Sequence, residues 1–117
     1  MNMNRCAAFI LGFLITAPMK SQAVVTIGDR SCGVWVDARR SEVINATASL
    51  DSLVVGAYLT GFMTGMAVDS RDDILRGTDY DSILLWMDKY CKAHPLEKIS
   101  YGGIELFFEL KSRMSKP

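Results

Sequence analysis

The chain has 117 residues, which is room for a single domain of ordinary size. Thirteen basic and thirteen acidic side chains balance, so the formal net charge is zero at neutral pH. Nucleic-acid-binding domains usually carry a cluster of basic residues, and the balanced charge of this chain, without a basic run, argues against this class. The sequence motifs of phosphate loops, dinucleotide-binding folds and serine hydrolases do not occur either.

The first 23 residues have the order of a secretory signal peptide. Arg5 is followed by the apolar run 7–17, and small residues at a cleavage site end at Ala23. We therefore expect residues 1–23 to be removed on export and residues 24–117 to form one domain in the periplasm. An uncleaved membrane anchor is the alternative, although the apolar run is shorter than the ~20 residues that a spanning helix needs.

Cleavage would leave two of the three cysteines, Cys32 and Cys91. Two cysteines in a small exported domain predict a disulfide, which would close a loop of about 60 residues and contribute ~4 kcal/mol. The only histidine, His94, follows Cys91 by three residues, so a thiol beside its base and a metal site are the alternatives. We favour the disulfide, because Cys91 lies on the apolar side of its predicted helix and a metal site would need more ligands.

The first predicted element of the domain is a short helix over residues 31–43. Apolar residues recur there at three- and four-residue steps from Cys32 to Ala38, and the charged residues cluster on the opposite side. A strand is the alternative, because valines alternate around Trp35. A loop is expected to follow.

The longest predicted helix covers residues 49–68 and has one broad apolar face. Residues 52–68 carry no charge, and this length lies at the lower edge of the membrane-spanning range. We expect instead a central helix that its neighbours bury on most sides. Gly61 and Gly65 are four residues apart on one face, which predicts a tightly packed contact there, because glycine is otherwise unfavourable inside a helix.

Two further elements are expected after this helix. Residues 72–75 predict a short helical turn, and Thr78 with Asp81 forms a capping pattern for a helix over residues 80–94. Cys91 is expected on the buried side of that helix, whereas Asp88, Lys89 and Lys92 are expected to face water.

Pro95 predicts both the end of one helix and the start of the next. It disfavours helical geometry in the residue before it and is itself a good first helical residue, so we expect the last helix to run from Pro95 to Met114. The sequence therefore predicts an all-α fold: a small single-domain bundle of about four helices, crosslinked by one disulfide.

Charged side chains in two segments are the candidates for contacts with a partner. The carboxylate pairs of the chain, Asp72 with Asp73, Asp79 with Asp81 and Glu105 with Glu109, lie in capping or exposed helical contexts, which do not predict a glycosidase. We assign no catalytic residue, metal ligand or cofactor site. The candidate partner-binding residues are Arg39, Arg40, Arg71, Asp72, Asp73 and Arg76.

Three stretches, "CGVWVDARR", "GAYLTGFMTG" and "WMDKYCKAHPLEKI", resemble two kinds of small exported helical bacterial proteins. These are the HdeA-type periplasmic acid-stress chaperones and the immunity proteins that neutralise type VI secretion amidase effectors. The shared pattern is a cysteine in the first helix, a glycine-rich central helix, and a late cysteine before a helix that opens with proline. The resemblance implies that Cys32 and Cys91 pair, and that Trp35, Gly61 and Pro95 are architectural.

These observations predict a non-catalytic periplasmic protein-binding module of the immunity (inhibitor) or chaperone type. Its expected partner is another protein, such as an effector, a client or an envelope component. A homodimer is compatible with the sequence, and neither a nucleic acid nor a small-molecule substrate is inferred. The alternative function is a membrane-linked component of an envelope or conjugation apparatus.

Overall fold

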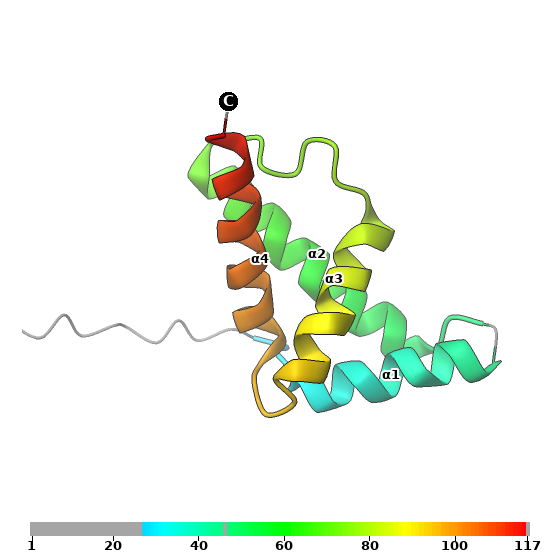
Figure 1. Ribbon diagram of the computed structural model, residues 1–117. Helices are drawn as coiled ribbons and strands as arrows, with labels where there is room; N and C mark the ends of the chain where they lie inside the picture. Colours follow the sequence, from blue (N-terminus) through cyan, green and yellow to red (C-terminus); the bar gives the residue numbers. More distant parts are fainter. Residues whose placement is uncertain (1–26, 46, 117) are drawn as a thin grey trace, which may run out of the picture.

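The computed structural model describes residues 27–45 and 47–116, and the predicted signal peptide lies outside them. The described residues form four helices and no strand, as the sequence predicts (Figure 1). The strand alternative for the first element is therefore wrong. The helices are α1 (Cys32–Asn45), α2 (Leu50–Ser70), α3 (Tyr80–Ala93) and α4 (Ile99–Met114).

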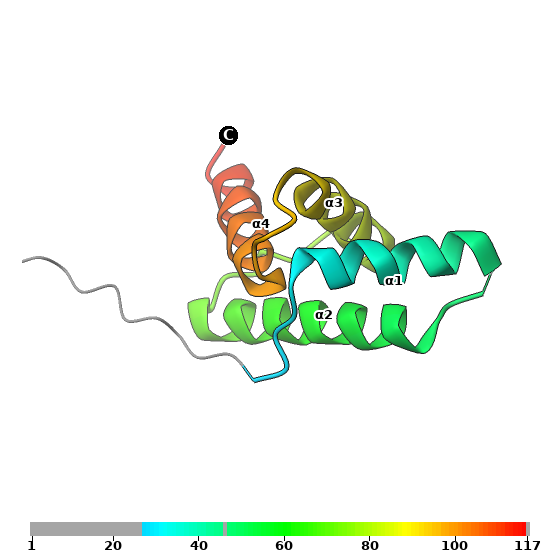
Figure 2. The same cartoon turned by 90° about the horizontal axis from the view of Figure 1, so that it is seen from below.

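The four helices enclose a single core. α1 and α2 form a hairpin, and α3 and α4 pack against this hairpin and against each other. Viewed from below, α2 runs along one side of the molecule, and the other three helices lie above it (Figure 2). The largest fully buried side chains of the core are Trp35, Leu59, Met63, Met87, Ile99, Val55, Cys32 and Cys91.

The predicted disulfide is present. Cys32 at the start of α1 and Cys91 near the end of α3 are bonded, and both side chains are fully buried. Backbone contacts reinforce this end of the fold: Cys32 N donates to the Glu97 carbonyl (2.8 Å), and Ser31 forms an isolated β-bridge with Lys98. The crosslink therefore joins α1, α3 and the segment that leads into α4.

The start of the last helix differs from the prediction. α4 begins at Ile99, and Pro95 lies in the preceding turn, in which Glu97 N donates to the His94 carbonyl (3.1 Å). Lys98 is extended because it pairs with Ser31, a residue far away in the sequence. Local proline chemistry correctly ended α3, whereas a long-range backbone pairing set the start of α4.

Two predictions about the segment between α2 and α3 also need correction. Asp79 caps α3, because its Oδ1 accepts from Ser82 N at 2.7 Å. Thr78 instead belongs to the turn before it, donating its own N–H to the Leu75 carbonyl (3.0 Å). The predicted helical turn at 72–75 is a hydrogen-bonded turn closed by Arg76 N rather than a helix.

The prediction of tight packing at Gly61 and Gly65 is wrong. Among the described residues, nothing lies within 4 Å of the position that a Cβ would take at either glycine. Close approach occurs instead at Gly56 of α2, where a Cβ would meet the Tyr80 side chain, and on α4. On α4 a Cβ at Gly103 would meet the Phe62 ring at 2.9 Å, and one at Gly102 would meet the Tyr90 ring at 2.8 Å.

α2 is consequently less buried than expected. One side of it contributes Val55, Leu59 and Met63 to the core. The opposite side is exposed to solvent over its whole length, and we call it the outer face of α2. This face consists of Leu50, Val54, Ala57, Gly61, Gly65 and Val68.

Candidate functional site

The structure separates the six predicted partner-binding residues into two distant groups. Arg39 and Arg40 lie on α1, whereas the other four lie in and around the connection between α2 and α3, at the opposite end of the fold (Figure 1). This second group has local roles: Arg71 ends α2 in the left-handed conformation (φ 57°), and Asp72 pairs with Lys111 (3.0 Å). Asp73 and Arg76 pair with each other at 2.7 Å. The six residues therefore do not form one site.

A polar cluster joins α1 to α3 beside the core. The Arg39 guanidinium donates from Nε to Asp88 Oδ1 (3.0 Å) and from Nη2 to Asp88 Oδ2 (3.2 Å). The fully buried Trp35 donates its indole N–H to the same Oδ1 atom at 2.7 Å. Asp88 is thus turned towards α1, and the prediction that it faces water is wrong.

The cluster extends to α2 through Glu42. Its Oε2 atom accepts from Arg39 Nη1 and from Ser52 Oγ, each at 2.5 Å. The hydrogen bond with Asp88, followed by the nearby charges, raises the pKa of Arg39 above its ordinary value in spite of partial burial. The Arg39 guanidinium is therefore positively charged and already bound to the carboxylates of Asp88 and Glu42, so it is not available to a partner.

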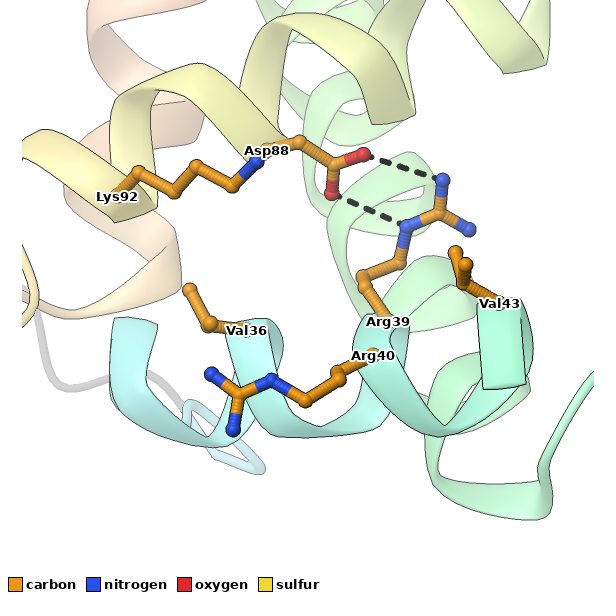
Figure 3. A pocket seen from close by; sticks show the side chains of 6 residues that line it. All are labelled: Val36, Arg39, Arg40, Val43, Asp88 and Lys92. Carbon is orange, nitrogen blue, oxygen red and sulfur yellow. Dashed lines mark hydrogen bonds and ion pairs between the residues drawn. The ribbon is translucent and has the colours of Figure 1, made fainter. Parts of the chain in front are cut away.

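A cavity of about 250 Å³ opens next to this cluster, between α1 and α3 (Figure 3). On α1 its residues recur at three- and four-residue steps, and on α3 they are one turn apart, so each helix presents one face to it. We call it the α1–α3 cavity. It is lined by Val36, Arg39, Arg40, Val43, Asp88 and Lys92.

Two cations of the α1–α3 cavity remain available to solvent. Arg40 makes one ion pair, with Asp37 at 3.5 Å, and both side chains are mostly exposed, so this pair is weak. Lys92 follows Asp88 by one helical turn, a spacing at which opposite charges normally pair. Because Asp88 is directed to Arg39 and Trp35, Lys92 makes no ion pair within residues 27–45 and 47–116.

Large aliphatic side chains are exposed at the end of the α1–α2 hairpin, next to this cavity. Four of them are between 54% and 80% exposed, and none takes part in the core. We call them the hairpin tip, and Val43 belongs both to the tip and to the wall of the α1–α3 cavity. The residues of the hairpin tip are Val43, Ile44, Leu50 and Leu53.

Sequence reasoning missed both the α1–α3 cavity and the hairpin tip. The helical period predicts the faces of α1 and α3, but not which faces lie opposite each other. One available signal was Trp35, because a buried indole N–H needs an acceptor, and a carboxylate on a neighbouring helix supplies one. A second available signal was the pair of apolar residues Val43 and Ile44, because they lie outside the face of α1 that carries Cys32, Trp35 and Ala38.

Cys91 and His94 do not form a reactive thiol–base pair. The Cys91 sulfur is bonded to Cys32, so it is not a free thiol that a histidine could activate. The exposed His94 ring stacks on Tyr90 with ring centroids 4.4 Å apart, and its Nδ1 lies 3.0 Å from the Tyr90 carbonyl oxygen. Over residues 27–45 and 47–116 no group of three or more histidine, cysteine or acidic side chains is arranged to hold a metal ion.

α2 is long and apolar enough, by length and composition alone, to cross a membrane. Only 28% of its most apolar stretch is buried inside the fold, in keeping with its exposed outer face. The same helix nevertheless supplies core residues such as Leu59 and Met63, both fully buried. A membrane-spanning α2 would have to leave that core.

Comparison with known proteins adds no further guide to the site: no protein-family model, curated protein or solved structure gives a match to the chain.

Proposed function

We propose that this chain is a non-catalytic module that binds another protein in the periplasm, as an inhibitor of the immunity type or as a chaperone. The observation that carries the proposal is the hairpin tip. Aliphatic side chains that are clustered and exposed at one end of a small domain are typical of an interaction surface, because their burial against a partner is favourable.

The rigidity of the fold around the tip supports this proposal. The disulfide holds the start of α1 against α3, the Arg39–Asp88 ion pair holds its middle, and Glu42 at its end binds Ser52 of α2 beside the tip, so contacts along α1 restrain the hairpin. Little conformational entropy is then lost on binding. A disulfide that closes a long loop also favours an oxidising compartment, which agrees with the signal peptide predicted for residues 1–23.

Affinity capture from periplasmic extract tests the proposal. The tagged protein should retain a partner that mass spectrometry identifies, and the Val43→Asp variant should lose it. Leu96→Asp is the matched control, because Leu96 is 95% exposed in the turn between α3 and α4, away from the hairpin tip. Recovery of no partner at neutral or acidic pH, or equal capture by both variants, would contradict the proposal.

The inhibitor and the chaperone are separated by their response to acid. A single histidine gives little change of charge between pH 5 and 8, so an acid-triggered change would come from the thirteen carboxylates at lower pH. Circular dichroism and client-aggregation assays near pH 3 provide the test. Loss of structure together with a gain of client binding indicates a chaperone, whereas retained structure and a single specific partner indicate an inhibitor.

The outer face of α2 favours a second candidate function, a membrane-linked component of an envelope or conjugation apparatus. Residues 52–68 carry no charge and α2 has the length to span a bilayer, which supports this candidate. The two functions predict different fractionation. Release of the protein by osmotic shock agrees with the soluble binding module, and retention in carbonate-washed membranes agrees with the membrane-linked component.

A further inference from the structure

We propose that the α1–α3 cavity receives the side chain of a glutamate from the partner protein. The inference rests on the proposed protein-binding function and specifies the chemistry of the partner's contact. It follows from the size of the cavity, the charges at its opening and its position beside the hairpin tip.

The size of the cavity suits one side chain. Its volume of about 250 Å³ is smaller than the roughly 300–1,000 Å³ of sites for small molecules and cofactors. Its apolar lining residues, Val36 and Val43, can contact methylene groups, and the paired side chains of Arg39 and Asp88 border it on one side (Figure 3). A side chain with a short aliphatic stem can therefore enter it and contact both valines.

The charges at the opening favour a carboxylate on that stem. The lining contains three cations and one carboxylate, and the carboxylate of Asp88 is paired with Arg39. Arg40 from α1 and Lys92 from α3 lie on two sides of the opening (Figure 3). Arg40 has only its weak pair with Asp37, so an incoming carboxylate meets two cations that it can bind without breaking the internal cluster.

The position of the cavity ties this contact to the hairpin tip. Val43 belongs to both, so a partner segment that covers the tip with apolar side chains can place a glutamate over the cavity. A glutamate has two methylene groups to contact Val36 and Val43, whereas the stem of an aspartate is shorter. An apolar contact surrounded by a charged rim is the usual composition of a protein interface.

The test is a titration of the isotope-labelled exported protein, followed by amide chemical shifts. The probes are blocked glutamate (N-acetylglutamate N-methylamide), the matching blocked glutamine, and N-acetylvaline, which carries a chain-terminal carboxylate. The glutamate probe should give saturable shifts confined to the α1–α3 cavity. Lys92→Gln should weaken it by roughly two- to fivefold, as expected for an exposed ion pair. Lys116→Gln is the matched control, because Lys116 lies beyond the end of α4, and should leave the titration unchanged.

Several results would overturn the inference. These are the absence of saturable shifts, equal shifts with the glutamine probe, or tighter binding of the chain-terminal carboxylate. Partner capture separates a failure of this inference from a failure of the proposed function. If Val43→Asp loses the partner but the double variant Arg40→Gln, Lys92→Gln retains it at full affinity, the docking function stands and the glutamate contact is refuted.

Discussion

Replacement of Asp88 by alanine tests whether the polar cluster holds α1 against α3. The substitution removes the acceptor of two Arg39 donors and of the Trp35 indole N–H. The two charged side chains are only 23% and 20% exposed, and the Trp35 ring is fully buried. Water therefore replaces the lost hydrogen bonds only in part.

The expected cost follows from these contacts. Breaking a fully buried ion pair by removing one partner costs about 3–5 kcal/mol, and a buried donor left without an acceptor costs about 1–3 kcal/mol. Partial exposure and the remaining bond of Arg39 to Glu42 reduce the total. We expect Asp88→Ala to lower the free energy of unfolding by about 2–4 kcal/mol, a large share of the total for a small domain.

Urea unfolding, followed by tryptophan fluorescence and far-ultraviolet circular dichroism, measures this difference. Asp37→Ala is the control, because its pair with Arg40 is exposed, and we expect a change within about 0.5 kcal/mol. Asp88→Asn retains an acceptor for Trp35 and should lie between the two. A loss of less than about 1 kcal/mol for Asp88→Ala, equal to that of Asp37→Ala, would refute the assigned role of the cluster.

Three further predictions concern the remaining parts of the fold. Gly61→Ala should raise the free energy of unfolding by up to about 1 kcal/mol, because the helix face around Gly61 is open. Gly102→Ala should be less stable than Gly61→Ala by about 1–3 kcal/mol, because the new methyl group would meet Met87 and the Tyr90 ring. Equal urea midpoints for the two variants would contradict this assignment. Replacing both cysteines of the disulfide by alanine should lower the free energy of unfolding by about 4 kcal/mol. The intact mass of the native protein should rise by the mass of two hydrogens on reduction. Cysteine thiols that react with alkylating reagents in the native protein would show that the bond is absent. The hydrogen bonds from Ser82 lower the pKa of Asp79, so its cap stabilises α3 above the unfolded-state pKa of about 4 and this contribution is lost as the pH falls through the lower folded-state pKa. Asp79→Ala should therefore lower the urea midpoint at pH 7 and do so less at pH 3, and a pH-independent difference would contradict the capping role.

The helices could be predicted from the sequence because they depend on local chemistry, and the disulfide could be predicted from the number of cysteines. The three- and four-residue steps around Trp35 predict α1, and the uncharged periodic stretch that follows Ser49 predicts α2. Pro95 correctly predicts the end of α3. Removal of residues 1–23, which the sequence predicts, would leave two cysteines and one intramolecular pairing. The bond between Cys32 and Cys91 was therefore predictable without knowledge of the fold.

The errors have a common physical cause, which is that a helical period does not tell which neighbour a face meets. Gly61 and Gly65 suggest close packing as much as Gly102 and Gly103 do, yet only the second pair lies where α4 meets its neighbours. Lys98 is extended rather than helical because it pairs with Ser31, which is 67 positions away. Neither outcome is encoded by the residues nearby in the chain.

The sequence by itself therefore determined the helical class and the four elements, because backbone propensity and apolar period are properties of short segments. It also determined the disulfide, because the predicted domain contains two cysteines. Only the tertiary structure decided that Asp88 is directed to Arg39 and so does not pair with Lys92 one helical turn later. It also decided that Val43 lies at the junction of the α1–α3 cavity and the hairpin tip. These features arise from the relative placement of α1 and α3, which depends on how all four helices fill one core at once.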